Sequence, residues 1–297
     1  MSASIRDKQW RLATLRKTFR ASDRPLKLFA ALALKRSGLC RLLTIQRDGF
    51  QLRFYPSSIS YQIWLHPESS PWEFGFVRRV LRPGDTFIDV GANIGEFTLT
   101  GLTAVGPAGK VVAIEAHPRI FGFLQGNLRL NAIPSDRYTA LNVAVGERQS
   151  QVYFSDGHDD DINHLEVGAA GVPVEMRRLD TLPLPPGAIT LLKVDVEGYE
   201  RYVLEGASGM IDRVECILIE YSDQNYAQFG YDQKMVTDAL HGYGFSLLRW
   251  EADGLVAPYE PVPAAVRFEN VIAVRDVRGF CSRNGFSLRA DSGVAHA

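Results

Sequence analysis

From residue 72 onward, short apolar runs rich in β-branched residues alternate with segments long enough to form helices. Strands that alternate with helices imply right-handed crossovers, because only that hand packs each helix back onto the sheet. The predicted fold is therefore α/β, with a mainly parallel seven-stranded sheet and helices on both faces. The expected strands span residues 86–90, 110–115, 138–143, 190–194, 216–220, 245–250 and 271–275.

The segments around this alternation have a different pattern. Residues 1–71 are expected to form a helical arm and a small antiparallel β unit, the latter from loosely alternating residues over 42–65. The main domain is predicted to span residues 72–276, with residues 155–189 inserted as strands and loops on the substrate side. Residues 277–297 are expected to be a flexible tail.

The first 41 residues are strongly basic, although the whole chain has a net charge of only −1. They contain eleven Lys or Arg residues and two acidic residues, Asp7 and Asp23, so the remainder carries a net charge of about −10. The apolar run over 28–34 is too short to span a bilayer. Two interpretations stay open for residues 1–41: peripheral contact with an anionic membrane surface, or a helical arm packed on the main domain.

The three cysteines, Cys40, Cys216 and Cys281, are far apart and form neither a C-x-x-C pair nor a zinc-site spacing. They are predicted to be reduced thiols in a cytoplasmic protein, with peripheral membrane attachment left open. The sequence does not specify an oligomeric state, and a dimer is compatible with it.

The segment Asp89-Val-Gly-Ala-Asn-Ile-Gly95 joins the first strand of the main domain to a helix start. Ligands of open parallel sheets bind beyond the carboxyl ends of the strands, and glycines there permit positive φ and close backbone approach. The G-x-x-x-G spacing lacks the second glycine of the dinucleotide fingerprint, which argues against a pyrophosphate. A strand-end carboxylate suits an α-amino group and the turn N–H groups suit a carboxylate, as in the methionine moiety of S-adenosylmethionine. The cofactor-binding residues expected here are Asp89, Gly91, Ala92, Asn93 and Gly95.

The next two strands end in residues that suit the rest of this cofactor. Glu115 lies 24 positions beyond Gly91, near the offset of about 20 residues at which a carboxylate binds ribose hydroxyls. Ala116 follows it. Asn142 and Ala144 lie at the end of the third strand, where small residues leave room for an adenine ring.

The fourth strand ends in Lys193-Val-Asp-Val-Glu-Gly-Tyr-Glu200, close to the expected methyl position. Methyl transfer to a hydroxyl is an in-line displacement that a general base assists. Asp195 and Glu197 are candidates for that base, with Lys193 orienting the charge, and Asp195 is also expected to contact the cofactor. Whether Asp195 is a base, a metal ligand or a substrate anchor stays open. Glu200 fits the preference of a first helical turn for acidic residues.

Asp89-Val-Gly-Ala-Asn-Ile-Gly95, Asn142-x-Ala-Val-Gly146 and the Lys193–Glu200 segment resemble, in this order and spacing, the FkbM-type methyltransferases. The resemblance covers roughly residues 72–222 and extends to Pro83-Gly-Asp85 and to Glu73, which it adds to the cofactor-binding set. It implies a class I methyltransferase (Rossmann-like) fold, S-adenosylmethionine as cofactor and an activity of class EC 2.1.1. It also implies O-methylation of a sugar, polyketide or other small hydroxylated molecule.

The acceptor is expected to be a small molecule or a glycan. Candidate contacts to it are His66, Asn163, His164 and Glu220, which lie in loops or at the end of the fifth strand. No metal site is predicted, and dependence on a divalent metal such as Mg²⁺ stays open. Asp195 and Glu220 would be the ligands if the enzyme used one.

Several other functions compete with O-methylation. N- or C-methylation of a small molecule would use the same cofactor site. An NAD-dependent oxidoreductase would require the missing G-x-G-x-x-G. A membrane-associated module without catalysis would act through residues 1–41. A nucleic-acid partner is not expected, because the chain beyond residue 41 is acidic and has no Asn-Pro-Pro-Tyr motif.

Overall fold

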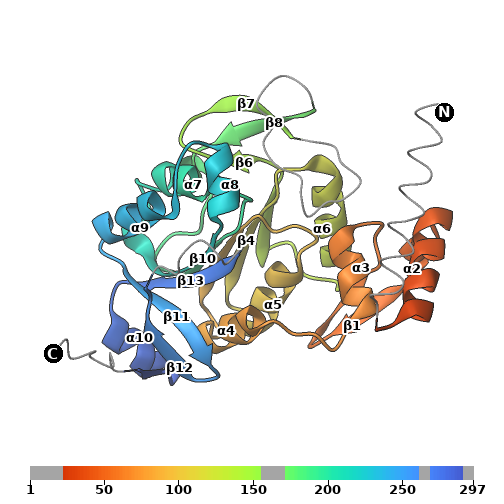
Figure 1. Cartoon of the computed structure of the whole chain (residues 1–297), viewed down its shortest axis with the longest axis horizontal. Coiled ribbons are helices and arrows are strands. Elements are labelled where there is room, and N and C mark those ends of the chain that lie inside the picture. Colours follow the sequence, from red (N-terminus) through yellow and green to blue (C-terminus); the bar gives the residue numbers. More distant parts are fainter. Residues whose placement is uncertain (1–22, 155–170, 261–267, 290–297) are drawn as a thin grey trace.

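The computed structural model describes residues 23–154, 171–260 and 268–289. Its main sheet consists of nine strands (Figure 1): β3 (Thr86–Val90), β4 (Lys110–Ile114), β5 (Tyr138–Leu141), β9 (Ile189–Val194), β10 (Val214–Tyr221), β11 (Ser246–Ala252), β12 (Leu255–Pro258), β13 (Glu269–Val274) and β14 (Ser287–Leu288). The strand order is β14-β12-β11-β13-β10-β9-β3-β4-β5. Neighbours from β5 to β10 are parallel, whereas β13 is antiparallel to both β10 and β11. The α/β prediction is confirmed, and β12 and β14 extend the sheet beyond the seven predicted strands.

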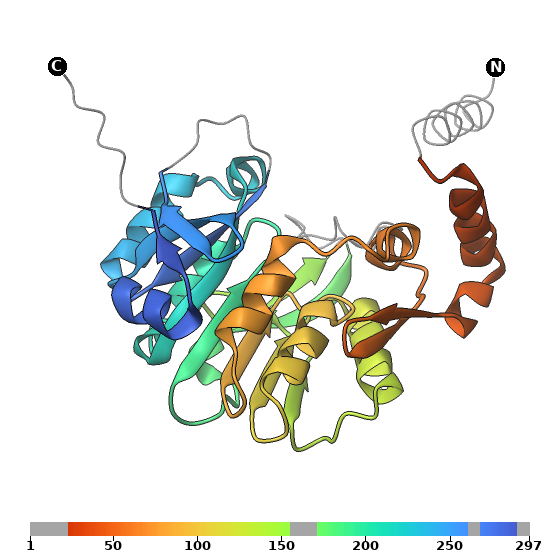
Figure 2. The same ribbon diagram turned by 90° about the horizontal axis from the view of Figure 1, so that it is seen from below.

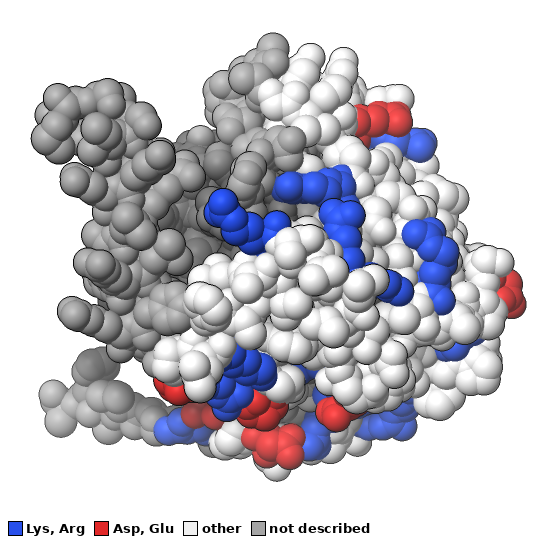
Figure 3. Space-filling view, turned by 90° about the vertical axis from the view of Figure 1, so that its right-hand side faces the viewer, with Lys and Arg blue, Asp and Glu red and all other residues white. Residues whose placement is uncertain are grey.

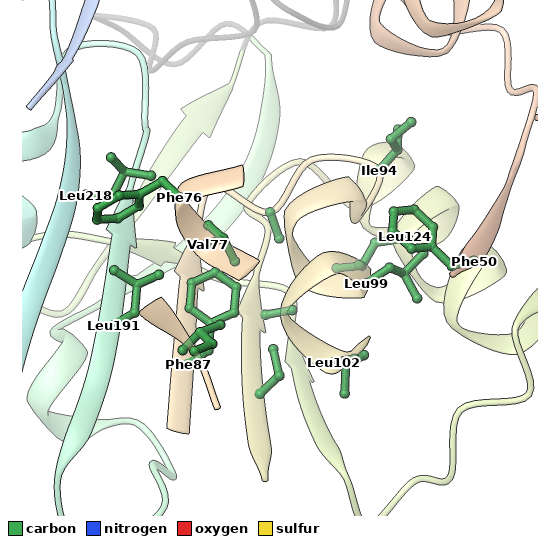
Figure 4. Packing of buried hydrophobic residues seen from close by; sticks show 14 of the residues in the cluster. Phe50, Phe76, Val77, Phe87, Ile94, Leu99, Leu102, Leu124, Leu191 and Leu218 are labelled. Carbon is green, nitrogen blue, oxygen red and sulfur yellow. The ribbon is translucent and has the colours of Figure 1, made fainter. Parts of the chain in front are cut away.

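Helices cover both faces of this sheet (Figure 2). One layer contains α4 (Trp72–Val80), α5 (Glu96–Ala104), α6 (Pro118–Leu130) and α10 (Val277–Asn284), and the other contains α7 (Glu200–Gly206) and α9 (Gln233–Gly242). Alternate strand residues face opposite layers. Phe87 packs with Phe76 and Leu191 under the first layer (Figure 4), while Ile88 belongs to the cluster under the second.

The order in which successive strands are added to the sheet reverses beside β3. The connections through α5 and α6 run from β3 to β4 and β5, and the connections through α7 and α9 continue from β9 in the opposite direction. In open α/β sheets such a switch point leaves a crevice between the diverging connections. The carboxyl ends of β3 and β9 therefore mark where a ligand site is expected.

The N-terminal part consists of α2 (Pro25–Ser37), the hairpin β1 (Thr44–Arg47) and β2 (Phe50–Arg53), and α3 (Ser58–Leu65). The hairpin agrees with the predicted antiparallel unit, but the prediction that this unit continues to residue 65 was wrong. Ser57 caps a helix there by accepting a hydrogen bond from the Ser60 N–H at 3.1 Å. Ile59 and Ile63, four residues apart, then share one face of α3.

The hairpin shares its hydrophobic core with the main domain. Phe50 and Leu124 lie in one cluster (Figure 4). The side-chain carbonyls of Asn127 on α6 and of Asn131 at its C-terminal cap accept the backbone N–H groups of Arg53 and Gln51, each at 2.8 Å. These amides satisfy the edge of β2, so α6 and the hairpin form one packed unit.

The predicted insertion contains part of a second, three-stranded sheet in the order β6-β8-β7. Its strands are β6 (Ala144–Val145), β7 (Ser150–Phe154) and β8 (Val172–Arg177). Asn163 and His164 lie outside the described residues.

The prediction of a flexible tail from residue 277 was wrong for the segment through β14. Cys281 and Phe286 are buried, and the Phe286 ring packs against Trp250 at 5.7 Å and Phe76 at 6.1 Å between centroids. The sequence from Asp276 to residue 289 is mostly polar, but Cys281 and Phe286 lie in the core, whereas Leu288 is exposed. Residues beyond 289 lie outside the described part.

Candidate functional site

A cavity of about 530 Å³ opens at the carboxyl ends of β3, β4 and β9. This volume lies in the usual range for small-molecule and cofactor sites. The sequence-predicted residues that line it are His66, Gly91, Ala92, Asn93, Glu115, Ala116, Ala144, Lys193, Asp195 and Glu197. The motifs predicted from separate strand ends therefore meet in one place.

Gly91 brings the turn after β3 against the end of β9. Its φ is +81°, and a Cβ atom there would lie 1.7 Å from the carbonyl oxygen of Asp195. The Asp195 N–H donates to the Val90 carbonyl at 3.1 Å. Asn93 also has a positive φ, 48°, which Asn tolerates better than most residues. The tight backbone contact explains the first glycine of the motif.

Gly95 has a different role from the predicted approach to a ligand. A Cβ atom there would lie 2.5 Å from Leu124 Cδ1 on α6, and the residue does not line the cavity. Its φ of +92° places it as the N-terminal cap of α5. The second glycine of the motif thus permits packing between α5 and α6.

Glu115 is fixed at the cavity wall by backbone groups on both sides. Its carboxylate accepts the Asn93 N–H at 2.9 Å and the His117 N–H at 2.8 Å. Burial raises the pKa of Glu115 to about 7, although these hydrogen bonds oppose the shift. Asn142 does not line the cavity; its amide donates to the carbonyls of Glu115 and Ala116 at 2.9 and 2.7 Å. Asn142 therefore positions the end of β4.

Lys193 lies between two carboxylates beneath the cavity. Its Nζ is 2.9 Å from Asp195 Oδ2 and 3.8 Å from Asp89 Oδ1, and it lies 4.8 Å from the centroid of the Phe97 ring. Burial would lower the pKa of this ammonium group, but Asp195 and Asp89 outweigh it and raise the pKa. Lys193 therefore stays protonated and holds one oxygen of Asp195.

The side chain of Asp89 is fully buried and does not line the cavity. The Thr98 hydroxyl donates to its Oδ2 at 2.6 Å. Burial raises the pKa of Asp89 against the opposing effects of Lys193 and Thr98. The structure places Asp89 behind Lys193, and this geometry does not support the predicted direct contact with an α-amino group.

Asp195, Glu197 and Glu220 bring carboxylate oxygens within 4.8 Å of one another. Oxygen donors of this kind could hold a hard divalent cation. No metal site was predicted from the sequence, which left Asp195 and Glu220 open as ligands if the enzyme used a metal. The Asn225 amide donates to Glu197 at 2.9 Å. Burial and the neighbouring carboxylates raise the pKa of Glu220 strongly. Glu220 itself does not line the cavity.

Glu73 is another predicted cofactor residue that does not belong to this arrangement. Its carboxylate accepts a hydrogen bond from the Asn270 amide on β13 at 2.8 Å, and it does not line the cavity. This hydrogen bond to Glu73 connects α4 to the sheet.

Other residues on the cavity wall were not identified from the sequence. Arg47 forms an ion pair with Glu96 at 2.6 Å, and both side chains are almost buried. Tyr199 lies in the Lys193–Glu200 motif, and its hydroxyl donates to Glu147 at 3.1 Å. Further lining side chains are Ile59, Gln62, Ile63, Phe74, Phe97, Ile120 and Phe154. Tyr199 could have been assigned from its place in the motif, whereas Arg47 lies in no recognisable pattern.

The family model for the methyltransferase FkbM domain matches residues 89–247. A solved FkbM methyltransferase from Methylobacillus flagellatus KT is 18% identical with a TM-score of 0.43; the match covers 85% of this chain but only 60% of that one. An S-adenosylmethionine-dependent O-methyltransferase from Thermotoga maritima is 14% identical, with coverages of 70% and 66% and a TM-score of 0.40. Magnesium protoporphyrin IX methyltransferase from Synechocystis, solved with bound SAH, is 13% identical, with coverages of 84% and 100% and a TM-score of 0.41.

The matched residues make up more than half of this chain. They include the glycine turn, Glu115 and the Lys193–Glu200 motif. This chain belongs to the FkbM methyltransferase domain family.

Proposed function

We propose that this protein transfers a methyl group from S-adenosylmethionine to a hydroxyl of a small-molecule or glycan acceptor. The observation that carries the proposal is the position of Asp195. It lines the cavity between the glycine turn and the buried ammonium of Lys193. Lys193 orients this partly exposed carboxylate, so that it can accept a proton from a ligand in the cavity.

The cavity fits S-adenosylmethionine in size and in the groups that it presents. The turn at Gly91 lines the cavity, and the Glu115 carboxylate can accept hydrogen bonds from ribose hydroxyls. Asp195 and Glu197 favour a cationic ligand on the same wall. When bound, the cofactor supplies a methyl group on a positively charged sulfur.

The residues of the chain would then align the acceptor and take up its proton. The acceptor oxygen bonds to the methyl carbon as the carbon–sulfur bond breaks, and its proton passes to the Asp195 carboxylate. The products are a methyl ether and S-adenosylhomocysteine. Lys193 holds Asp195 Oδ2, so the carboxylate is oriented before the acceptor binds.

The walls of the cavity favour an acceptor with a largely apolar body. Ile59, Ile63 and Phe74 line the side formed by α3 and α4, and Gln62 and His66 contribute polar groups there. A hydroxyl on a polyketide-like or lipid-like molecule fits these side chains better than an unmodified sugar does. We expect small molecules rather than nucleic acids as acceptors.

Calorimetry and a methyl-transfer screen test the proposal. We expect S-adenosylhomocysteine to bind and NAD not to bind. A screen with labelled S-adenosylmethionine against sugars, lipids and polyketide-like alcohols, with magnesium or with a chelator, identifies the acceptor class and metal use together. Tight binding of NAD without binding of S-adenosylhomocysteine would contradict the proposal.

The role of Asp195 is tested separately. Asp195→Asn should lower turnover at least about 100-fold while leaving cofactor affinity within about tenfold, because the amide cannot accept the proton. Asp212→Asn is the matched control, since Asp212 precedes β10 at the opposite end of the sheet. Near-normal turnover of Asp195→Asn would refute the assignment.

A further inference from the structure

The outward face of α2 and of the 3-10 turn that follows it (Leu39–Leu42) exposes an unusual amount of apolar surface. Of the seven large hydrophobic side chains that are exposed in the described part of the chain, four lie between residues 26 and 42. Leu26 is 87% exposed, Leu42 75% and Leu39 52%, and the fourth is Phe29. On the opposite side, α2 buries Leu28 and Ala31 in the protein. The helix is thus apolar on its covered face and on its outward face, rather than amphipathic.

Cationic side chains border this apolar surface. The sequence from Arg24 to Arg47 contains six Lys or Arg residues and no acidic residue. Lys35 and Arg36 lie in the last turn of α2, and Arg41 lies in the turn that follows. Figure 3 faces this side of the molecule and shows Lys and Arg side chains bordering a largely uncharged surface.

We propose that this surface, consisting of Leu26, Leu39 and Leu42 with Lys35, Arg36 and Arg41, docks on an anionic phospholipid bilayer. The leucines would enter the boundary between headgroups and acyl chains, while the cations bind lipid phosphates. Among the described residues no helix combines the length and apolarity that crossing a bilayer requires. With 13 residues, α2 is about 20 Å long, shorter than the hydrocarbon core.

Charge favours a lipid surface over the other candidate occupants. In a two-fold dimer the same patch would face itself, so Lys35, Arg36 and Arg41 would oppose identical cations. Residues 1–22 are also basic, with six Lys or Arg and one Asp, and carry the same sign as the patch. The chain beyond residue 41 has a net charge of about −10, so an anionic surface would repel most of the molecule and orient it with this patch inward.

The patch is firmly connected to the cavity wall. Lys27 on α2 donates to the Leu65 carbonyl at 3.1 Å, and its Nζ lies 5.6 Å from the centroid of the Trp64 ring on α3. The α3 residues Ile59 and Ile63 line the cavity. Docking through α2 would therefore hold one wall of the cavity close to the lipid.

Sedimentation of the full chain with vesicles tests the proposal without any assay of methyl transfer. Vesicles of phosphatidylcholine with phosphatidylglycerol should bind the protein at least about tenfold more tightly than phosphatidylcholine alone, and added salt should weaken the binding. Equal binding to both vesicles, or to neither, would overturn the proposal.

Two variants separate the apolar and cationic contributions. Leu26→Ser/Leu39→Ser/Leu42→Ser and Arg36→Glu/Arg41→Glu should each weaken binding to the mixed vesicles at least about tenfold. Leu288→Ser and Arg278→Glu, which change exposed residues in β14 and α10, are the matched controls and should bind normally. Unchanged affinity for S-adenosylhomocysteine, or an unchanged thermal transition, shows that each variant is folded. Normal vesicle binding by both multiple variants, or a dimer in light scattering that the leucine variant dissociates, would contradict the proposal.

Discussion

Gly91 and Asp195 are 104 positions apart in the sequence, yet their backbones are in contact. At the scale of single residues, this contact forms part of the cavity wall, because it holds the turn after β3 against the residue proposed as the base. Glu115 is held in a comparable way, by the N–H groups of Asn93 and His117. Backbone groups therefore position the turn and Glu115, whereas the side chain of Lys193 positions the Asp195 carboxylate.

Replacement of Gly91 by Ala should disrupt this contact. The positive φ costs about 1–2 kcal/mol for a residue with a Cβ, and the overlap with the Asp195 carbonyl adds about 1–3 kcal/mol. Gly84→Ala is the control, because Gly84 also has a positive φ but no atom within 4 Å of an added Cβ. Urea unfolding should show the larger loss for Gly91→Ala, together with weaker S-adenosylhomocysteine binding in calorimetry. Equal effects of the two substitutions would rule out the close contact.

Cofactor binding should strengthen as the pH rises through about 7. Burial raises the pKa of Glu115 to about 7, so the carboxyl group is mostly protonated at pH 6 and mostly ionised at pH 8. The ionised form accepts hydrogen bonds from ribose hydroxyls at both oxygens. Calorimetry should show affinity for S-adenosylhomocysteine about tenfold higher at pH 8 than at pH 6. Glu115→Gln should remove this dependence, and its persistence in that variant would assign it to another group.

At the scale of secondary-structure elements, the hairpin completes one wall of the cavity. Arg47 at the end of β1 forms an ion pair with Glu96 in the first turn of α5, and its guanidinium donates to the carbonyls of Pro67 and Ser69. The hairpin, α5 and the loop after α3 are thereby joined at the cavity. Breaking a buried pair leaves a charge without its partner, which is more costly than replacing both partners.

Arg47→Met should therefore lower the free energy of unfolding by about 3–5 kcal/mol. The double variant Arg47→Met/Glu96→Leu should recover a large part of this loss, because the buried carboxylate is also removed. Denaturant unfolding at neutral pH measures both. If the double variant were less stable than Arg47→Met, the hydrogen bonds to the loop carbonyls would be the main contribution of Arg47.

At the scale of the whole molecule, the C-terminal segment forms one edge of the sheet. α10 and β14 add Phe286 to an aromatic cluster with Phe76 and Trp250, and β14 pairs with β12 at the sheet edge. Phe286 thereby covers an apolar face of α4, although it lies 210 positions after Phe76 in the sequence. The expected flexible tail is instead ordered as far as β14, and it contributes Cys281 and Phe286 to the core.

Phe286→Ala should lower the free energy of unfolding by about 3 kcal/mol or more, as for other buried phenylalanines. Leu288→Ala, two residues further, should change it by no more than about 0.5 kcal/mol, because Leu288 is exposed. Thermal and denaturant unfolding compare the two variants. A small effect of Phe286→Ala would show that the segment contributes little to stability.

The sequence alone determined seven of the nine strands of the main sheet, the glycine turn and the strand ends at Glu115 and Lys193–Glu200, because local spacing and periodicity encode these features. It also located the basic arm, but not which apolar residues of α2 are exposed. Only the tertiary structure decided that Asp89 lies behind Lys193, that Gly95 packs on Leu124 and that Arg47 lines the cavity. Each of these contacts joins segments that are separated in the chain. It depends on how both segments pack in the folded protein, so the local sequence of either segment alone does not encode it.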